Sequence, residues 1–167
     1  STFIWDLNAE IPVGIYDSLT FIFGISEARN KPGLFVNPPE VNMAWPHQLG
    51  DGYHYMMLNG FWLNTAGERK SFNFHLGIGQ IYRNNSGQVE DIIEFIQNYF
   101  SVKPPDSGFS AEKGQTVKAR FTMNIENWFR DPHTYDHNQW GGAIMQNQDA
   151  MQMGCENGWN VFSVEYF

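Results

Sequence analysis

Short segments in which apolar and polar residues alternate are the feature that most constrains this fold. In SFNFHL, residues 71–76, the side chains of Phe72, Phe74 and Leu76 fall on one face of an extended chain. TVKARFTMNI, residues 116–125, alternates in the same way. Because successive side chains of a β-strand point to opposite faces, this period predicts strands with one buried face.

Further segments of this kind predict strands over residues 1–7, 16–25, 53–58 and 161–167. An aromatic content of 16% and a charged content of 17% favour half-buried strands. Many short strands separated by turn residues are typical of a mostly-β fold. We therefore expect an antiparallel β-sandwich with long irregular loops and a short helical insertion.

Two segments carry a helical or an ambiguous pattern. Residues 87–100, GQVEDIIEFIQNYF, place Ile92, Ile93 and Ile96 on one helical face, but their β-branched side chains also allow a strand. Residues 139–154 space apolar side chains three and four positions apart, which predicts a short helix.

The size and charge of the chain exclude several classes of protein. A length of 167 residues suits a single domain, residues 1–167. The net charge is −8 and the ten Lys and Arg residues are scattered, which argues against nucleic-acid binding. No apolar run of about 18 residues occurs, so we expect no membrane span. Cys155 is the single cysteine, which excludes a disulfide within the chain and predicts a small buried residue.

Motifs of catalysis are missing from the sequence. It contains no HExxH, no GxSxG and no glycine-rich phosphate loop, and its carboxylates are dispersed. A hydrolase needs a nucleophile or an activated water beside a base, and no such set can be assembled. We therefore expect a protein that is not an enzyme.

Metal binding is better supported, because imidazole nitrogen suits copper, zinc, nickel and iron. His47 follows Trp45 and Pro46 in a loop that the proline stiffens. His75 lies on the strand face opposite to the phenylalanines of SFNFHL, so it points outward or into a cleft. Two histidines from separate segments can then converge, although their spacing alone is no motif.

The other histidines are better explained by packing. His54, in YHYMML, shares a strand face with Met56 and Leu58, which favours a buried histidine with satisfied hydrogen bonds. His133 and His137 are four residues apart and would share a helical face. The proline and the polar residues around them favour a loop over a metal site.

Several segments resemble, in order, the MbnP-like copper-binding protein family, which is related to the surface copper proteins MopE and CorA. The resemblance rests on IPVGIYDSLTFIFGISEARN, NMAWPHQLGDGYHYMMLNG, FNFHLG, NIENWFRDP and MQNQDAMQMGCENGWNVF. NMAWPHQLGDGYHYMMLNG, residues 42–60, is the specific part. Two departures stand out: we expect the family's N-terminal strands to be absent here, and His47 replaces the second tryptophan of the family's Trp-x-Trp. The resulting Trp-x-His is the arrangement of the MopE copper site.

The resemblance implies a function and a site. Copper-binding members hold Cu(I) with two histidines beside a tryptophan oxidised to kynurenine. By position, Trp45 is the kynurenine candidate, His47 and His75 are the ligands, and Met43 is a packing residue or a soft contact. In that family a diheme oxidase of the MbnH/MauG type oxidises the tryptophan. A secreted protein at the cell surface or in the periplasm is implied, with copper as Cu(I) or Cu(II).

Two other functions stay open. Aromatic and Asn-rich loops that carry Trp62, Trp128 and Trp140 would suit a non-metal binding module for carbohydrate or protein. A surface-assembly subunit is the second alternative, since a strand donated by another chain can complete an open sheet edge.

Overall fold

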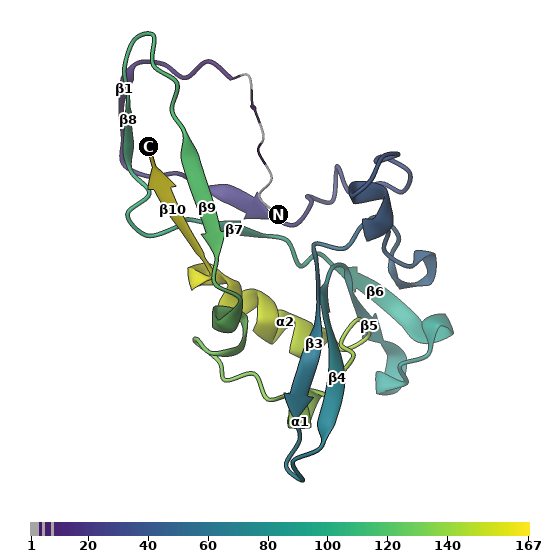
Figure 1. Cartoon of the computed structure of the whole chain (residues 1–167). Helices are drawn as coiled ribbons and strands as arrows, with labels where there is room; N and C mark the ends of the chain where they lie inside the picture. Colours follow the sequence, from purple (N-terminus) through teal and green to yellow (C-terminus); the bar gives the residue numbers. More distant parts are fainter. Residues whose placement is uncertain (1–3, 5, 8) are drawn as a thin grey trace.

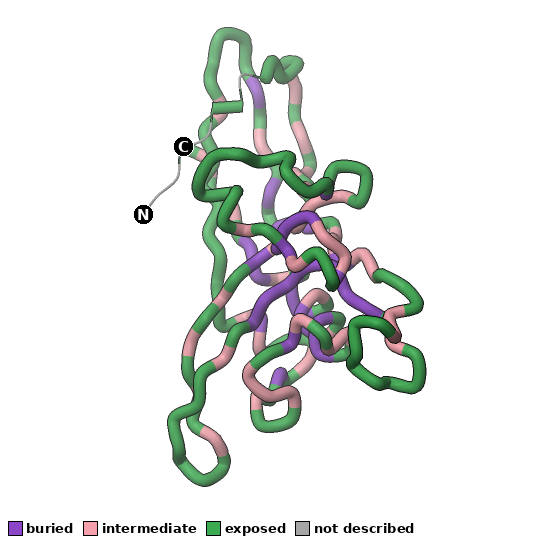
Figure 2. The backbone as a smooth tube through the Cα atoms, turned by 90° about the vertical axis from the view of Figure 1, so that its right-hand side faces the viewer, coloured by how far each residue is buried: buried purple, intermediate pink, exposed green. Residues whose placement is uncertain are grey.

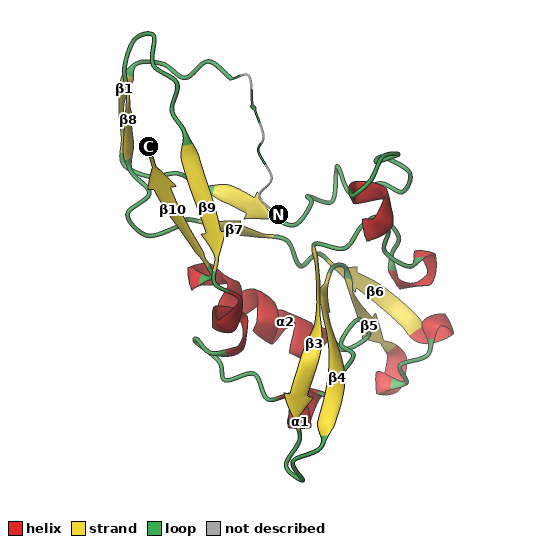
Figure 3. Cartoon of the chain, viewed as in Figure 1, coloured by secondary structure: helices red, strands yellow, loops and turns green. Residues whose placement is uncertain are grey.

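The fold is seen in a computed structural model that describes residues 4, 6, 7 and 9–167 (Figures 1 and 3). Its strands are β1 (Gly14–Tyr16), β2 (Phe21–Phe23), β3 (Met56–Leu63), β4 (Arg69–Leu76), β5 (Gly79–Tyr82), β6 (Ile92–Ile96), β7 (Phe100–Val102), β8 (Phe109–Ala111), β9 (Ala119–Met123) and β10 (Phe162–Tyr166). Its α-helices are α1 (His137–Trp140) and α2 (Gln148–Asn157). Short 3-10 turns are η1 (Glu40–Met43), η2 (His47–Leu49), η3 (Arg83–Asn85), η4 (Val89–Asp91), η5 (Ile125–Phe129) and η6 (Gly158–Asn160).

The strands of the described chain pair as antiparallel ladders of two strands each: β1 with β8, β2 with β7, β3 with β4, β5 with β6, and β9 with β10. This confirms the mostly-β, antiparallel fold with a short helix, built from strand pairs rather than from two broad sheets. Helix α2 lies between the β9–β10 ladder and the β3–β4 hairpin (Figure 1). No helix in the described part of the chain is long and apolar enough to cross a membrane.

The core gathers between α2 and one face of β4. Phe74 and Leu76 of β4, Trp128 of η5 and Met151 of α2 are almost completely buried. Buried stretches meet in the middle of the molecule, whereas the loops and hairpin ends are exposed (Figure 2). Burial of each such apolar side chain contributes roughly 1.5–3 kcal/mol, so this cluster fixes the orientation of β4.

The alternating pattern predicted some strands well and others badly. Strands β4 and β10 form where SFNFHL and residues 161–167 predicted them. Strand β9 forms within residues 116–125, but all five of its residues are exposed, so the expected buried face was wrong. Residues 1–7 lie largely outside the described residues, and those described there are not in a strand.

The prediction of one strand over residues 16–25 was wrong, because a loop separates β1, which ends at Tyr16, from β2, which begins at Phe21. The hydroxyl of Ser107 accepts from the Leu19 amide at 3.1 Å and donates to the Leu19 carbonyl at 3.3 Å. These bonds take the backbone groups that a continuous ladder would have used. Gly24 then ends β2 with a φ of +96°, in the left-handed region that favours glycine.

The structure also decides between helix and strand for residues 87–100 and for residues 139–154. Residues 87–100 contain a strand, β6, which pairs with β5. The helix predicted over residues 139–154 begins later, at α2. Asn147 caps it, since the Asn147 side-chain oxygen accepts from the Ala150 amide at 3.1 Å. Strand β3 begins at Met56, three residues after the start predicted at Tyr53.

Candidate metal centre

His75 lies on the outer face of the β3–β4 hairpin, opposite to the core face that carries Phe74 and Leu76. Its neighbours on this face, Met57 and Asn59, are exposed. His75 is nevertheless only 8% exposed, so another part of the chain covers it.

The cover comes from the loop between η1 and β3, which folds back on itself. Ala44 and Tyr53 form an antiparallel bridge, which makes neighbours of the residues that flank it. The His54 amide donates to the Met43 carbonyl at 2.6 Å. The indole of Trp45 and the imidazole of His54 consequently meet edge to face, with ring centroids 4.6 Å apart.

The reversal of this loop depends on unusual backbone angles. Gly50, Asp51 and Gly52 have φ values of +120°, +65° and +84°. A Cβ at Gly52 would collide with the side-chain oxygen of Asn30, which accepts from the Tyr53 amide at 2.9 Å. The GDG sequence is therefore what lets the chain turn tightly enough to bring the two aromatic rings together.

Three rings stand in a row as a result. His54 contacts Trp45 on one side and His75 on the other, where the ring centroids are 5.0 Å apart and the planes are nearly perpendicular, at 83°. His54 is 8% exposed and Trp45 is 2% exposed. The structure thus forms a buried histidine pair beside a tryptophan, at the end of the hairpin away from its turn.

The hydrogen bonds of the two imidazoles indicate which nitrogens carry protons. Nδ1 of His54 lies 3.0 Å from the carbonyl oxygen of Met43, and Nε2 of His75 lies 2.8 Å from Oδ1 of Asn59. Since both oxygens only accept, the facing nitrogens donate, and Nε2 of His54 and Nδ1 of His75 keep their lone pairs. Neither lone-pair nitrogen has a hydrogen-bond partner among the described residues, although both are buried.

Burial favours the neutral form of both rings. Loss of hydration lowers the pKa of His54 below its usual value, against the effect of its backbone hydrogen bonds. The pKa of His75 is lowered mainly by burial and further by the neighbouring His54. A neutral imidazole with an unshared pair is the form that binds a metal ion, so both rings are ready as ligands at neutral pH.

The donor set fits a metal with few protein ligands. Two imidazoles that share an ion at metal–nitrogen distances of about 2 Å have ring centroids roughly 5–6 Å apart, and the His54–His75 separation of 5.0 Å falls at the lower end. No group of three or more His, Cys, Asp and Glu side chains suited to a metal occurs in the described chain. A closed structural zinc site takes four such ligands, so the pair fits copper better.

Trp45 is held from several sides. Its Nε1 donates to the Leu49 carbonyl at 2.9 Å. Gly77, just beyond β4, faces the six-membered ring so closely that an added Cβ would lie 2.5 Å from two of its carbons. The HLG sequence of residues 75–77 therefore supplies one imidazole and the space for the neighbouring indole.

The structure places His47 elsewhere. Its side chain is 88% exposed, and its Nδ1 pairs with Oδ2 of Asp51 at 2.9 Å. Hydrogen bonding to His47, and then to the Gly52 amide, lowers the pKa of Asp51. Among the contacts of the described chain, none joins the His47 ring to Trp45 or His75. The sequence-predicted residues Trp45 and His75 come together, and His54 occupies the position between them.

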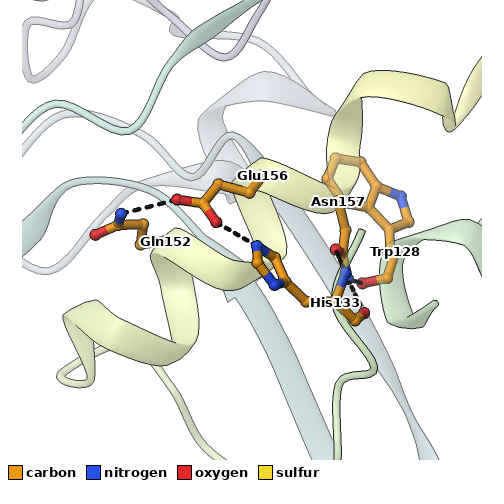
Figure 4. A network of polar contacts seen from close by, with 5 residues as sticks. All are labelled: Trp128, His133, Gln152, Glu156 and Asn157. Atoms are coloured by element: carbon orange, nitrogen blue, oxygen red, sulfur yellow. Dashed lines mark hydrogen bonds and ion pairs between the residues drawn. The ribbon is translucent and has the colours of Figure 1, made fainter. Parts of the chain in front are cut away.

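His133 and His137 have separate roles in packing. The His133 ring binds Glu156 of α2, and its amide donates to the side chain of Asn157 at 2.9 Å (Figure 4). His137 stacks on Phe72, with ring centroids 4.4 Å apart. These partners tie the loop before α1 to α2 and the start of α1 to β4, so the two histidines have separate neighbours.

Of the three tryptophans assigned to a non-metal binding surface, Trp128 is not available to one. Trp128 is completely buried in the core. Trp62 stacks on His137, with ring centroids 5.3 Å apart, and Trp140 packs near Tyr135. The expectation that Trp128 lies in a binding loop was therefore wrong.

His54 is the residue that reasoning from the sequence missed. Its strand-like setting pointed to a buried histidine with satisfied hydrogen bonds. The residue is buried, but its Nε2 has no hydrogen-bond partner among the described residues. The signal that could have found it is LGDGY, residues 49–53, because Gly-Asp-Gly predicts a tight reversal. Pairing of the chain on both sides of such a reversal brings Trp45 and His54 together.

Comparison with known proteins agrees with the resemblance read from the sequence. The model of the MbnP family matches residues 2–151, a span that includes all three residues of the row. No curated protein and no solved structure matches the chain. On the strength of the family match, which covers most of its length, the chain belongs to the MbnP family.

Proposed function

We propose that this protein binds a copper ion through Nε2 of His54 and Nδ1 of His75, beside Trp45. The observation that carries the proposal is the pair of buried nitrogens with free lone pairs, on rings whose centroids are 5.0 Å apart. A buried polar atom without a partner is costly, and a bound ion would satisfy both at once.

The residues around the pair have defined tasks in this proposal. The Met43 carbonyl and the Asn59 amide oxygen hold the two rings in the tautomers that leave the ligating nitrogens free. Trp45 covers His54 and excludes water from that side. Copper, when bound, would supply a one-electron redox couple, and imidazole nitrogens can hold either Cu(I) or Cu(II).

The resemblance extends the proposal to modification and location. Trp45 is the residue that would be oxidised to kynurenine by a diheme partner enzyme of the MbnH/MauG type. The protein would act outside the cytoplasm, at the cell surface or in the periplasm, as a copper carrier without catalytic activity. The non-metal binding and surface-assembly roles stay predictions.

Copper binding by single-residue variants tests the site. We expect the purified protein to bind one equivalent of Cu(I), measured by competition with a chromophoric chelator, and His54→Ala and His75→Ala each to weaken binding at least about 100-fold, equal to 2.7 kcal/mol. His47→Ala is the matched control, since it removes an exposed imidazole from the same loop. Loss of copper in His47→Ala with retention in His54→Ala would contradict the proposal and support the ligand set implied by the family motif.

The state of Trp45 is measured separately. Peptide mass spectrometry of protein from the native source is expected to show a gain of about 4 Da at Trp45, the change from tryptophan to kynurenine. An unmodified Trp45 in protein that holds copper would refute the oxidation and leave the histidine site standing.

A further inference from the structure

The residue directly across the hairpin from His75 is a methionine. In the β3–β4 ladder, Met57 is the register partner of His75. Directly opposite residues of an antiparallel pair point to the same face, with Cβ atoms about 4.5–5.5 Å apart. The Met57 side chain therefore stands beside the His75 ring, on the face that also carries Asn59.

Met57 is more exposed than is usual for methionine, which leaves its side chain free to change rotamer. Met57 is 40% exposed, whereas His75 beside it is 8% exposed. Methionine has three rotatable bonds and a polarizable sulfur two bonds beyond Cβ. Rotation about these bonds carries the sulfur over a neighbouring ring without any movement of the backbone.

Other methionines near the row are less suitable. Met56 points to the opposite face of β3 and is part of the buried core. Met43 is engaged through its backbone carbonyl, which holds His54, the middle ring of the row. Met57 is thus a thioether on the outer face of the hairpin, directly opposite His75 in the ladder.

We propose that Met57 is the third, thioether ligand of the copper ion and makes the site selective for Cu(I). Thioether sulfur is a soft donor that prefers Cu(I) to Cu(II), whereas imidazole accepts both. The inference rests on the proposed copper site and adds to it a residue that sets the oxidation state.

X-ray absorption of the copper-loaded, unmutated protein is the first test. We expect a sulfur scatterer at roughly 2.3 Å, the distance of sulfur ligands at zinc sites, in addition to nitrogen at about 2 Å. Met57→Leu is expected to remove the sulfur signal and keep the nitrogen signal. A copper shell with nitrogen alone in the unmutated protein overturns the inference.

Affinities for the two oxidation states give a second test. Met57→Leu is expected to weaken Cu(I) binding about tenfold and to leave Cu(II) binding within about twofold, which lowers the Cu(II)/Cu(I) potential by about 59 mV. Met43→Leu and Met56→Leu are matched controls and are expected to change neither. Equal losses for Cu(I) and Cu(II), or a larger effect of Met43→Leu, would contradict the role of Met57.

The outcomes separate this inference from the copper site itself. If the unmutated protein binds no copper, the proposed function fails. If it binds copper through His54 and His75 while Met57→Leu retains full Cu(I) affinity, only the thioether ligand fails. Because Met57 is partly exposed, its replacement by leucine is expected to preserve folding, which the circular dichroism spectrum and melting temperature check.

Discussion

Replacement of Gly77 by alanine is the sharpest test of how the row of rings is held. A Cβ at this position would lie 2.5 Å from Cε3 and Cζ3 of Trp45 and 2.9 Å from Cη2. Ordinary contacts between carbon atoms are about 3.5–4.0 Å, so the overlap is roughly 1 Å over one edge of a rigid ring. The Leu49 hydrogen bond and the His54 ring restrict the retreat of the indole.

The expected cost follows from this overlap. Forcing an extra methyl group into a packed site typically costs about 1–3 kcal/mol, and the rigidity of Trp45 places Gly77→Ala in the upper half of that range. Displacement of the indole toward His54 would also weaken copper binding. Urea unfolding monitored by circular dichroism gives the free energy of unfolding, and chelator competition gives the copper affinity.

Gly14→Ala is the matched control, because an added Cβ there meets a single side-chain atom, of Tyr16, at 4.0 Å. It is expected to change the free energy of unfolding by less than about 1 kcal/mol, with a gain from reduced unfolded-state entropy. If Gly77→Ala costs no more than Gly14→Ala, the argument that Gly77 makes room for Trp45 is refuted.

Three further predictions follow from the same site and its surroundings. Asn59→Leu removes the acceptor that orients the His75 ring, and is expected to lower copper affinity about 10–100-fold in chelator competition, with Asn73→Leu, on the same face of β4, as control. Burial lowers the pKa values of His54, His75 and His137 in the folded protein below about 6.5, the value for an unfolded histidine. The metal-free protein is therefore expected to lose stability as the pH falls below about 6.5, because the unfolded chain then binds more protons than the folded one. Urea unfolding between pH 7.5 and 5.5 measures the free energy of unfolding, and a value that does not change with pH would contradict this prediction. Tyr135→Phe removes a buried hydroxyl that has no partner within the described chain, so its melting temperature is expected to stay equal or rise; a fall of several degrees would reveal a hydrogen bond of that hydroxyl.

Local sequence patterns predicted the parts of the fold that depend on local packing. SFNFHL alternates strictly and forms β4, because a single buried face is enough to specify a strand. Residues 87–100 were ambiguous, since the choice between helix and strand is made by pairing with β5, a distant partner in the sequence. The interruption of the predicted strand at Leu19 could not be foreseen, because the hydroxyl that binds the Leu19 backbone belongs to Ser107, 88 residues further along the chain.

The same limit applies to the candidate site. Trp45 and His75 were indicated by motif and by strand face, both of which are local properties. The position of His54 between them depends on the reversal through Gly50, Asp51 and Gly52, and on the bridge that this reversal closes. The Trp-x-His motif points to His47 because His47 is close to Trp45 in the sequence. The turn through residues 50–52 instead brings His54 next to Trp45 in space.

The Leu49 carbonyl, next to Trp45 in the loop, has two hydrogen-bond donors. The Leu49 carbonyl that accepts from the Trp45 indole also accepts from the side chain of Gln80, at 2.9 Å. If the indole is opened, shifted or replaced by phenylalanine, this buried oxygen keeps one donor. The second donor keeps the Leu49 carbonyl satisfied when the indole bond is lost, so a chemical change at Trp45 leaves no buried acceptor without a partner.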